Sequence, residues 1–158
     1  MSPISLNSLS ANNQVASKEK KKAKTDPYAT AERSAAVLKL GAEFRKNRIS
    51  AADMMSTDEA AELAGVSRVT INAWIKQGRC IGLSNLRRGF KLPKWQFEPM
   101  LFKLIPRLFE ALGTKDGWSL MAFLENPQEA FNGRTPLVAL AQGEPPERIL
   151  QLALAEGH

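Results

Sequence analysis

TDEAAELAGVSRVTINAWIK, residues 57–76, has the pattern of two short helices joined by a tight turn. Ser56 and Glu59 are spaced as a capping box at the start of the first helix, and Ser67 can cap the second. Gly65 lies at the turn, where a side chain would hinder the backbone. We therefore expect a helix-turn-helix with these apolar or small residues inside: Ala60, Ala61, Ala64, Val66, Ile71 and Trp74.

The charge of this region is one-sided. Residues 64–95 contain seven Lys or Arg and no Asp or Glu. A helix and hairpin with only positive charge are typical of DNA-binding surfaces. Asp58, Glu59 and Glu62 belong to the first helix, where they favour its dipole and should lie away from phosphate. The alternative is a helical hairpin that packs against another element and binds no nucleic acid.

The composition sets limits on the rest of the chain. Of the 158 residues, 1–25 carry a net charge of +4, 26–95 of +5 and 96–158 of −3, which gives +6 overall. A basic front and an acidic rear indicate two roles. Cys80 is the only cysteine, so no internal disulfide can form and a reducing compartment is expected. No membrane span or secretory signal is predicted, and we expect a cytoplasmic protein.

Three parts are predicted. Residues 1–26 are expected to be a disordered basic tail, which either adds nonspecific affinity for DNA or has no specific partner. Residues 27–97 form the predicted DNA-binding domain, and a helix over 28–48 precedes the helix-turn-helix. Its apolar stripe, which fits a support helix or a dimer seam, is made of Val37, Leu40, Gly41 and Phe44. Residues 98–158 form a second, helical domain.

A β-hairpin is predicted directly after the helix-turn-helix. Residues 80–83 and 90–92 are strand candidates, and the turn residues between them place Arg87 and Arg88 near the tip. The aromatic residues within 93–97 either stack on bases or anchor the core. We favour the core, because single-strand binders usually display aromatic side chains on an open sheet.

TDEAAELAGVSRVTINAWIKQGR with the RRGFKL hairpin resembles the winged helices of MerR-type and excisionase-type DNA-binding proteins. The resemblance implies that the second helix reads the major groove and the hairpin contacts phosphate or the minor groove. Asn suits adenine and Arg suits guanine, whereas Ser67 and Thr70 can equally cap the helix. The candidate DNA-binding residues are Ser67, Arg68, Thr70, Asn72, Lys76, Arg79, Arg87, Arg88 and Lys91.

Proline, glycine and capping residues divide the C-terminal part into short helices. Pro106 is predicted in the first turn of a helix that ends at Leu112. A second helix is marked by Trp118, Met121 and Leu124. Further helices are predicted over 137–142 and from Pro145-Pro146 to Ala155, and together the predicted helices make a compact acidic bundle.

FLENPQEAFNGRTPLVALAQGEPPERILQLALAEGH, residues 123–158, resembles the C-terminal toxin-binding domain of the Xre/MbcA/ParS antitoxins, most specifically in GRTP, residues 133–136. Members of that family neutralise RES-type toxins, which consume NAD, and repress their own operon. The resemblance implies that a toxin binds this region and that the last residues enter its active site. The candidate toxin-binding residues are Arg134, Gly157 and His158.

Residues needed for catalysis are scarce. The only histidine is His158, and the sequence has neither a CxxC pair nor a glycine-rich phosphate loop. We expect no enzyme activity, no metal site and no cofactor. The sequence thus predicts a mainly α protein with a winged helix-turn-helix: a dimeric DNA-binding antitoxin and autorepressor that binds double-stranded DNA and no membrane. The alternative is a stand-alone regulator or recombination-directionality factor of a mobile element.

Overall fold

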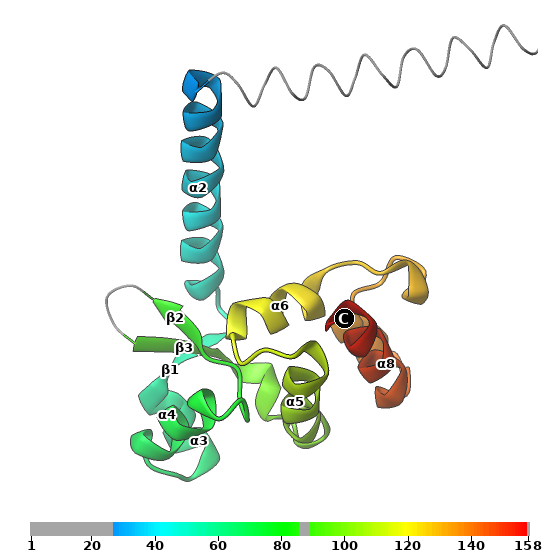
Figure 1. Cartoon of the computed structure of the whole chain (residues 1–158). Helices are drawn as coiled ribbons and strands as arrows, with labels where there is room; N and C mark the ends of the chain where they lie inside the picture. The colour runs from blue at the N-terminus through cyan, green and yellow to red at the C-terminus, as the bar shows by residue number, and fades with distance from the viewer. Residues whose placement is uncertain (1–26, 86–88, 158) are drawn as a thin grey trace, which may run out of the picture. The chain divides into compact units, whose positions relative to one another are not determined.

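The computed structural model describes residues 27–85 and 89–157, which are mainly helical with one small antiparallel sheet (Figure 1). The chain divides into two parts between Arg48 and Ile49. The predicted tail (1–26), Arg87 and Arg88 of the hairpin tip and His158 lie outside the described residues. The elements are α2 (Pro27–Ile49), β1 (Met54–Ser56), α3 (Thr57–Ala64), α4 (Arg68–Lys76), β2 (Leu83–Asn85), β3 (Gly89–Pro93), η1 (Lys94–Phe97), α5 (Pro99–Leu112), α6 (Gly117–Glu125), η2 (Glu129–Phe131), α7 (Pro136–Ala141) and α8 (Pro146–Gly157).

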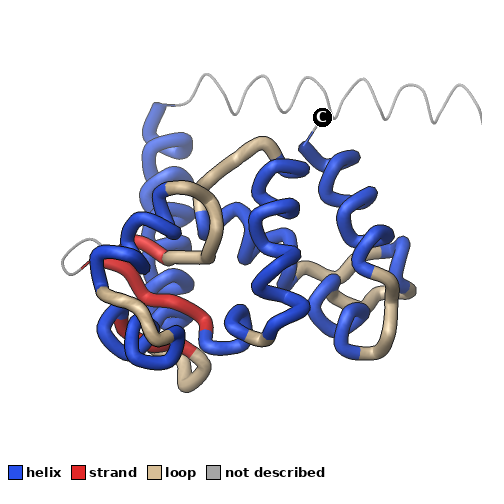
Figure 2. The backbone as a smooth tube through the Cα atoms, turned by 90° about the horizontal axis from the view of Figure 1, so that it is seen from below, coloured by secondary structure: helices blue, strands red, loops and turns tan. Residues whose placement is uncertain are grey.

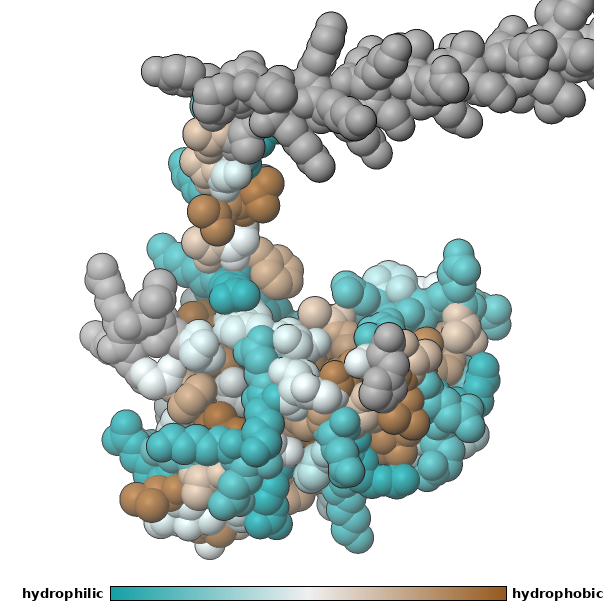
Figure 3. Space-filling view, in the orientation of Figure 1, coloured by the Kyte–Doolittle hydropathy of each residue, from teal (hydrophilic) through white to brown (hydrophobic). Residues whose placement is uncertain are grey.

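The first part is the helix α2, which confirms the helix predicted over 28–48. The large residues of its apolar stripe are exposed: Val37 to 67%, Leu40 to 66% and Phe44 to 63%. Figure 3 shows the resulting hydrophobic surface along the helix. Both interpretations of this stripe, a support face and a dimer seam, stay predictions.

In the second part, the local signals for α3 and α4 are confirmed. The Ser56 hydroxyl accepts the Glu59 backbone N–H at 3.1 Å, and Glu59 Oε1 accepts the Ser56 backbone N–H at 3.2 Å. The Ser67 hydroxyl accepts the Thr70 backbone N–H at 3.2 Å and so begins α4. Gly65 ends α3 with a φ of 70°, a left-handed conformation that glycine adopts without strain.

Two apolar clusters hold the second part together. The smaller cluster consists of Met55, Ala60, Ala61, Ile71, Ile75, Cys80 and Leu92, with Ala64, Val66 and Trp74 half-buried against it. The larger cluster joins residues of α5 to α8 to Met54, Ile81 and Leu83. Packing is therefore continuous across residues 97 and 98, where the sequence suggested a domain boundary.

The sheet has the order β1-β3-β2, with both pairs antiparallel. The strand predicted over 80–83 is shifted, because β2 begins only at Leu83. The reason is Gln96, a fully buried side chain whose amide accepts the Ile81 N–H at 2.6 Å and donates to the Ile81 carbonyl at 2.9 Å. The Gln96 side chain thus forms the two hydrogen bonds with the Ile81 backbone that a neighbouring strand would otherwise form. The three-residue strand β1, which pairs with β3, was not predicted.

The aromatic residues of η1 lie against the core, as the core-anchor interpretation expects. Trp95 packs on the larger cluster, and its indole N–H donates to Asp53 at 2.9 Å. Phe97 packs on the smaller cluster and stacks on Phe102 with ring centroids 5.6 Å apart. One short 3₁₀ helix thus connects the two clusters.

The predicted start of the first C-terminal helix was wrong. α5 begins at Pro99, where the Glu98 carboxylate accepts the N–H groups of Met100 and Leu101 at 3.3 and 3.1 Å. Pro106 therefore lies inside the helix, where it has no N–H to donate to Phe102 one turn earlier. The helix continues because its apolar face is buried and α8 packs against α5.

The remaining helices confirm the sequence pattern. Asp116 caps α6, and Thr135 caps α7 with Pro136 in its first turn. α8 begins at Pro146, as predicted, and extends to Gly157. Figure 2 shows how helices predominate over the three short strands.

Candidate nucleic-acid interface

The helix α4 turns one face into the small cluster and the other to solvent. Ile71 and Ile75 are buried, whereas Arg68 and Lys76 are exposed and Asn72 is half-exposed. Residues 68, 72 and 76 follow one another at intervals of four, so they form a row along the outward face. That face carries no acidic side chain.

The two hydroxyl residues at the start of α4 are engaged with each other. Ser67 Oγ lies 3.0 Å from Thr70 Oγ1, in addition to accepting the Thr70 backbone N–H. Their geometry is that of a helix cap. The contact with phosphate that the sequence allowed for these two residues stays a prediction.

Arg68 lies beside an acid of the preceding helix. Its Nε is 3.8 Å from Asp58 Oδ1, and the two side chains are exposed to 64% and 73%. The expectation that the acids of α3 lie away from the basic face therefore does not hold for Asp58. An ion pair this exposed contributes little, so Arg68 can exchange Asp58 for another anion at small cost.

A cleft of about 720 Å³ separates the start of α4 from the sheet. Its lining residues are Ser56, Thr57, Asp58, Arg68, Gly89, Phe90 and Lys91. The Thr57 hydroxyl donates to the Phe90 carbonyl at 3.4 Å and ties α3 to β3 at the base of the cleft. Two of the predicted DNA-binding residues, Arg68 and Lys91, are thereby brought to the same cleft.

Two charged side chains near this cleft, Arg79 and Glu59, have partners within the chain. The Arg79 guanidinium lies 5.8 Å from the centre of the Trp74 ring, a cation–π distance. Hydrogen bonds from Ser56 lower the pKa of Glu59, and the positive charges of Lys94 and Lys91 act in the same direction. Glu59 is thus kept ionised by the cap that it completes.

The outward face of α4 also carries Val69, which was not among the predicted DNA-binding residues. Val69 is 77% exposed, although it is a large apolar side chain, and it lies in the first turn of α4. Its spacing of three residues before Asn72 puts it on the same helix face, but spacing alone does not distinguish an exposed apolar residue from a buried one.

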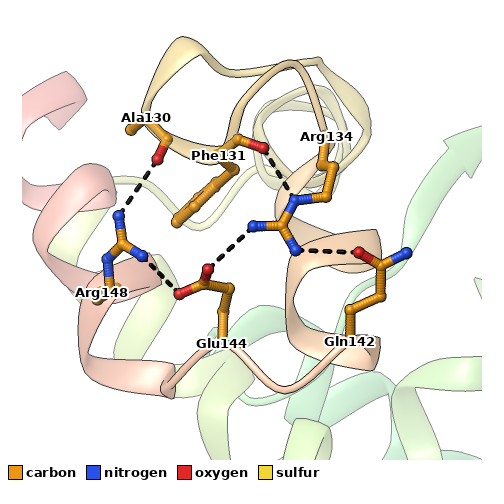
Figure 4. A network of polar contacts seen from close by, with 6 residues as sticks. All are labelled: Ala130, Phe131, Arg134, Gln142, Glu144 and Arg148. Carbon is orange, nitrogen blue, oxygen red and sulfur yellow. Dashed lines mark hydrogen bonds and ion pairs between the residues drawn. The ribbon is translucent and has the colours of Figure 1, made fainter.

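The predicted toxin-binding residue Arg134 is at the centre of a polar network (Figure 4). Its Nε donates to the Phe131 carbonyl at 2.9 Å, Nη1 to Gln142 Oε1 at 3.0 Å and Nη2 to Glu144 Oε1 at 2.9 Å. The side chain is 28% exposed. Arg134 therefore joins the loop between η2 and α7 to the connection between α7 and α8.

Glu144 receives a second arginine in the same network. Arg148 Nη1 donates to Glu144 Oε2 at 2.6 Å, and Nη2 donates to the Ala130 carbonyl at 3.2 Å (Figure 4). The Arg148 guanidinium also lies 5.3 Å from the centre of the Phe131 ring. The hydrogen bond from Arg134, and then the one from Arg148, hold the pKa of Glu144 below its usual value.

Gly157, another predicted toxin-binding residue, is constrained by packing. A Cβ at this position would lie 2.5 Å from the Ala111 carbonyl oxygen, which is closer than real Cβ atoms approach. The glycine therefore lets the end of α8 approach the end of α5. His158, the third predicted residue, is outside the described part of the chain.

Cys80 and the possible metal ligands can be described for the same residues. Burial raises the pKa of the Cys80 thiol to about 12. Within residues 27–85 and 89–157, no group of three or more His, Cys, Asp or Glu side chains could hold a metal ion. None of the helices in these ranges is long and apolar enough to span a membrane.

Comparison with protein-family models, with curated proteins and with solved structures gives no significant match to the chain.

Proposed function

We propose that the chain is a DNA-binding transcriptional regulator in which α3, α4 and the β2–β3 hairpin act as a winged helix-turn-helix. The outward face of α4 carries this proposal, since Arg68, Asn72 and Lys76 stand on it in one row while Ile71 and Ile75 anchor the helix from behind. A helix with its side chains is about 10–12 Å across, and the major groove of DNA is about 12 Å wide.

Charge and shape support the same function. Lys91 lies on the cleft that begins at Arg68, so positive side chains from two elements line one concave surface. Such a surface would follow the phosphates on either side of a groove into which α4 is inserted. Asn72 adds a group that can hydrogen-bond to a base edge, which nonspecific attraction to phosphate does not require.

The test is selection of duplexes from a random pool by the full chain, followed by affinity measurements on the enriched sequence. The double variant Arg68→Ala/Asn72→Ala should lose most of the preference for this sequence over a scrambled duplex. Arg107→Ala/Gln151→Ala is the matched control, because it removes an exposed Arg and an exposed amide from α5 and α8. The proposal is rejected if the α4 double variant and the control prefer the enriched duplex over the scrambled one equally, or if no sequence is enriched.

We further propose that the regulator acts as a homodimer. DNA regulators with a helix in the major groove commonly read two half-sites about one helical turn apart, roughly 10 base pairs or a multiple of it. The selected sequence should then be a palindrome with this spacing. A single, asymmetric half-site bound by one chain would contradict the dimer.

A second candidate function is neutralisation of a RES-type toxin by the C-terminal helices. It is supported by the way in which the GRTP segment folds: Thr135 caps α7, Pro136 opens it, and Arg134 binds Glu144 in the connection between α7 and α8. The GRTP segment is the most specific part of the antitoxin resemblance, and a toxin would bind the helices that it joins. The autorepressor would combine this function with the DNA-binding face.

Co-expression with the neighbouring reading frame tests the antitoxin function. The neighbour should arrest growth when expressed alone, and the full chain should restore growth. Deletion of residues 157–158, which removes the predicted contact without placing a side chain against Ala111, should abolish rescue. Absence of arrest, or rescue by an unrelated DNA-binding protein, would remove the antitoxin function and leave the regulator.

A further inference from the structure

The outward face of α4 contains one residue that neither packing nor charge explains. Val69 is 77% exposed, the largest fraction among the exposed large hydrophobic residues in the described ranges. A β-branched residue also has a lower helix propensity than alanine. Its presence here suggests that it contacts an apolar group outside the chain.

Helix geometry places Val69 among the polar residues of the candidate interface. It precedes Asn72 by three residues and Lys76 by seven, and these spacings put side chains on the same face of an α-helix. Ile71 and Ile75 lie on the other face, where both are buried. Whatever Asn72 contacts, Val69 would therefore contact the adjoining surface.

The major groove has one apolar group that distinguishes bases, the 5-methyl group of thymine. An asparagine side chain can donate its amide N–H to adenine N7 and accept from the adenine N6 amino group with its carbonyl oxygen, which makes it the usual reader of that base. The Asn72 amide makes no hydrogen bond among the described residues, so its donor and acceptor are both available. One helix face thus offers a contact for thymine and a contact for adenine.

We propose that Val69 is a specificity-determining residue that packs on a thymine methyl group, while Asn72 hydrogen-bonds to a neighbouring adenine. This inference rests on the proposed DNA-binding function. It specifies the target as duplex DNA whose half-site contains an A·T base pair. RNA would not satisfy it, because uracil lacks the methyl group and the major groove of an RNA helix is too narrow for side chains to read.

The experiment uses the full chain and the duplex selected from a random pool. Each thymine is replaced in turn by deoxyuridine, which removes only the methyl group. At one thymine of the half-site, the wild-type chain should lose about fourfold in affinity, the effect of one buried methyl group. The Val69→Ala variant should bind the thymine and deoxyuridine duplexes equally. Val138→Ala, at an exposed valine of α7, should behave as the wild type.

The outcomes separate this inference from the function beneath it. If the chain binds the selected duplex but every deoxyuridine is tolerated, the role of Val69 is rejected and the regulator stands. If Val69→Ala weakens binding to the thymine and deoxyuridine duplexes by the same factor, the variant still prefers thymine. Val69 then contacts something else, and the inference also fails. If no duplex is enriched by the wild-type chain, both proposals fail together.

Discussion

Arg68 and Arg134 are the same residue type in two very different surroundings. Arg68, on α4, has one ion pair at 3.8 Å and a side chain that is 64% exposed. Arg134, in the loop before α7, donates to three acceptors at 2.9–3.0 Å and is 28% exposed. The first guanidinium is available to a partner, whereas the second is used to hold the fold. An arginine's role therefore depends on the acceptors that the chain folds around it.

Removing Arg134 should have the largest effect on stability. Arg134→Ala removes the guanidinium hydrogen bonds to the Phe131 carbonyl, Gln142 and Glu144, and hydrogen bonds to charged groups contribute about 1.5–3 kcal/mol each. We expect a loss of about 2–3 kcal/mol in the free energy of unfolding, measured by urea denaturation at pH 7. Arg107→Ala, which removes an exposed ion pair with Glu147, should cost less than about 0.5 kcal/mol. Equal stability of both variants would show that Arg134 is not structural.

Removing Arg68 should act on binding instead. Arg68→Ala is expected to weaken the selected duplex by about 1–3 kcal/mol and to relax one base position. Because the side chain is exposed, the free energy of unfolding should change by less than about 0.5 kcal/mol. Fluorescence anisotropy and urea denaturation of the same preparation measure both quantities. If Arg68→Ala lowers stability without changing DNA affinity, Arg68 holds the fold, as Arg134 does, and is not available to a partner.

The Lys91 side chain tests whether the cleft follows the DNA backbone. Lys91→Ala should weaken all duplexes alike and lower the slope of log affinity against log salt by about one, because one phosphate contact is lost. Lys103→Ala, at an exposed lysine of α5, is the control and should keep the wild-type slope. If the two variants have equal slopes, β3 does not contact phosphate.

A smaller effect is expected from pH on the Arg134 network. The pKa of Glu144 is lowered from 4.5 in the folded chain, so its ionisation stabilises the fold above about pH 4.5. This contribution should be lost as the pH falls through the folded-state pKa. Urea midpoints between pH 7 and 3 should converge for the wild type and Glu144→Gln at the acid end. When Arg134→Ala is also present, the urea midpoints with and without Glu144→Gln should differ much less at every pH. An undiminished difference would exclude Arg134 as the main cause of the lowered Glu144 pKa.

The smallest effect concerns Asp58. Asp58→Asn releases Arg68 from its exposed partner, and such pairs contribute up to about 1 kcal/mol. Affinity for a nonspecific duplex at low salt should rise by no more than about fivefold. Glu147→Gln removes the same charge beside Arg107, and it should leave the affinity unchanged. A rise in both variants would point to net charge alone.

Much of the local structure around the candidate interface was predictable, because its signals lie within four residues of one another. Ser56 with Glu59 and Ser67 with Thr70 are such pairs. The residues on the outward face of α4 follow from the same helical period. Val69 was not predicted, because an exposed apolar residue has no distinct sequence pattern, and only its exposure in the folded chain identified it.

The sequence by itself determined where most helices begin, which face of each is apolar and where the positive charge gathers, since neighbouring residues decide these properties. Only the tertiary structure decided that Gln96 replaces a strand at Ile81, that Pro106 lies within α5 and that Arg134 is held by Glu144. The partners in these contacts come from other elements, or from packing that overrides a local signal. No local pattern specifies them, because they exist only once the chain has brought those elements together.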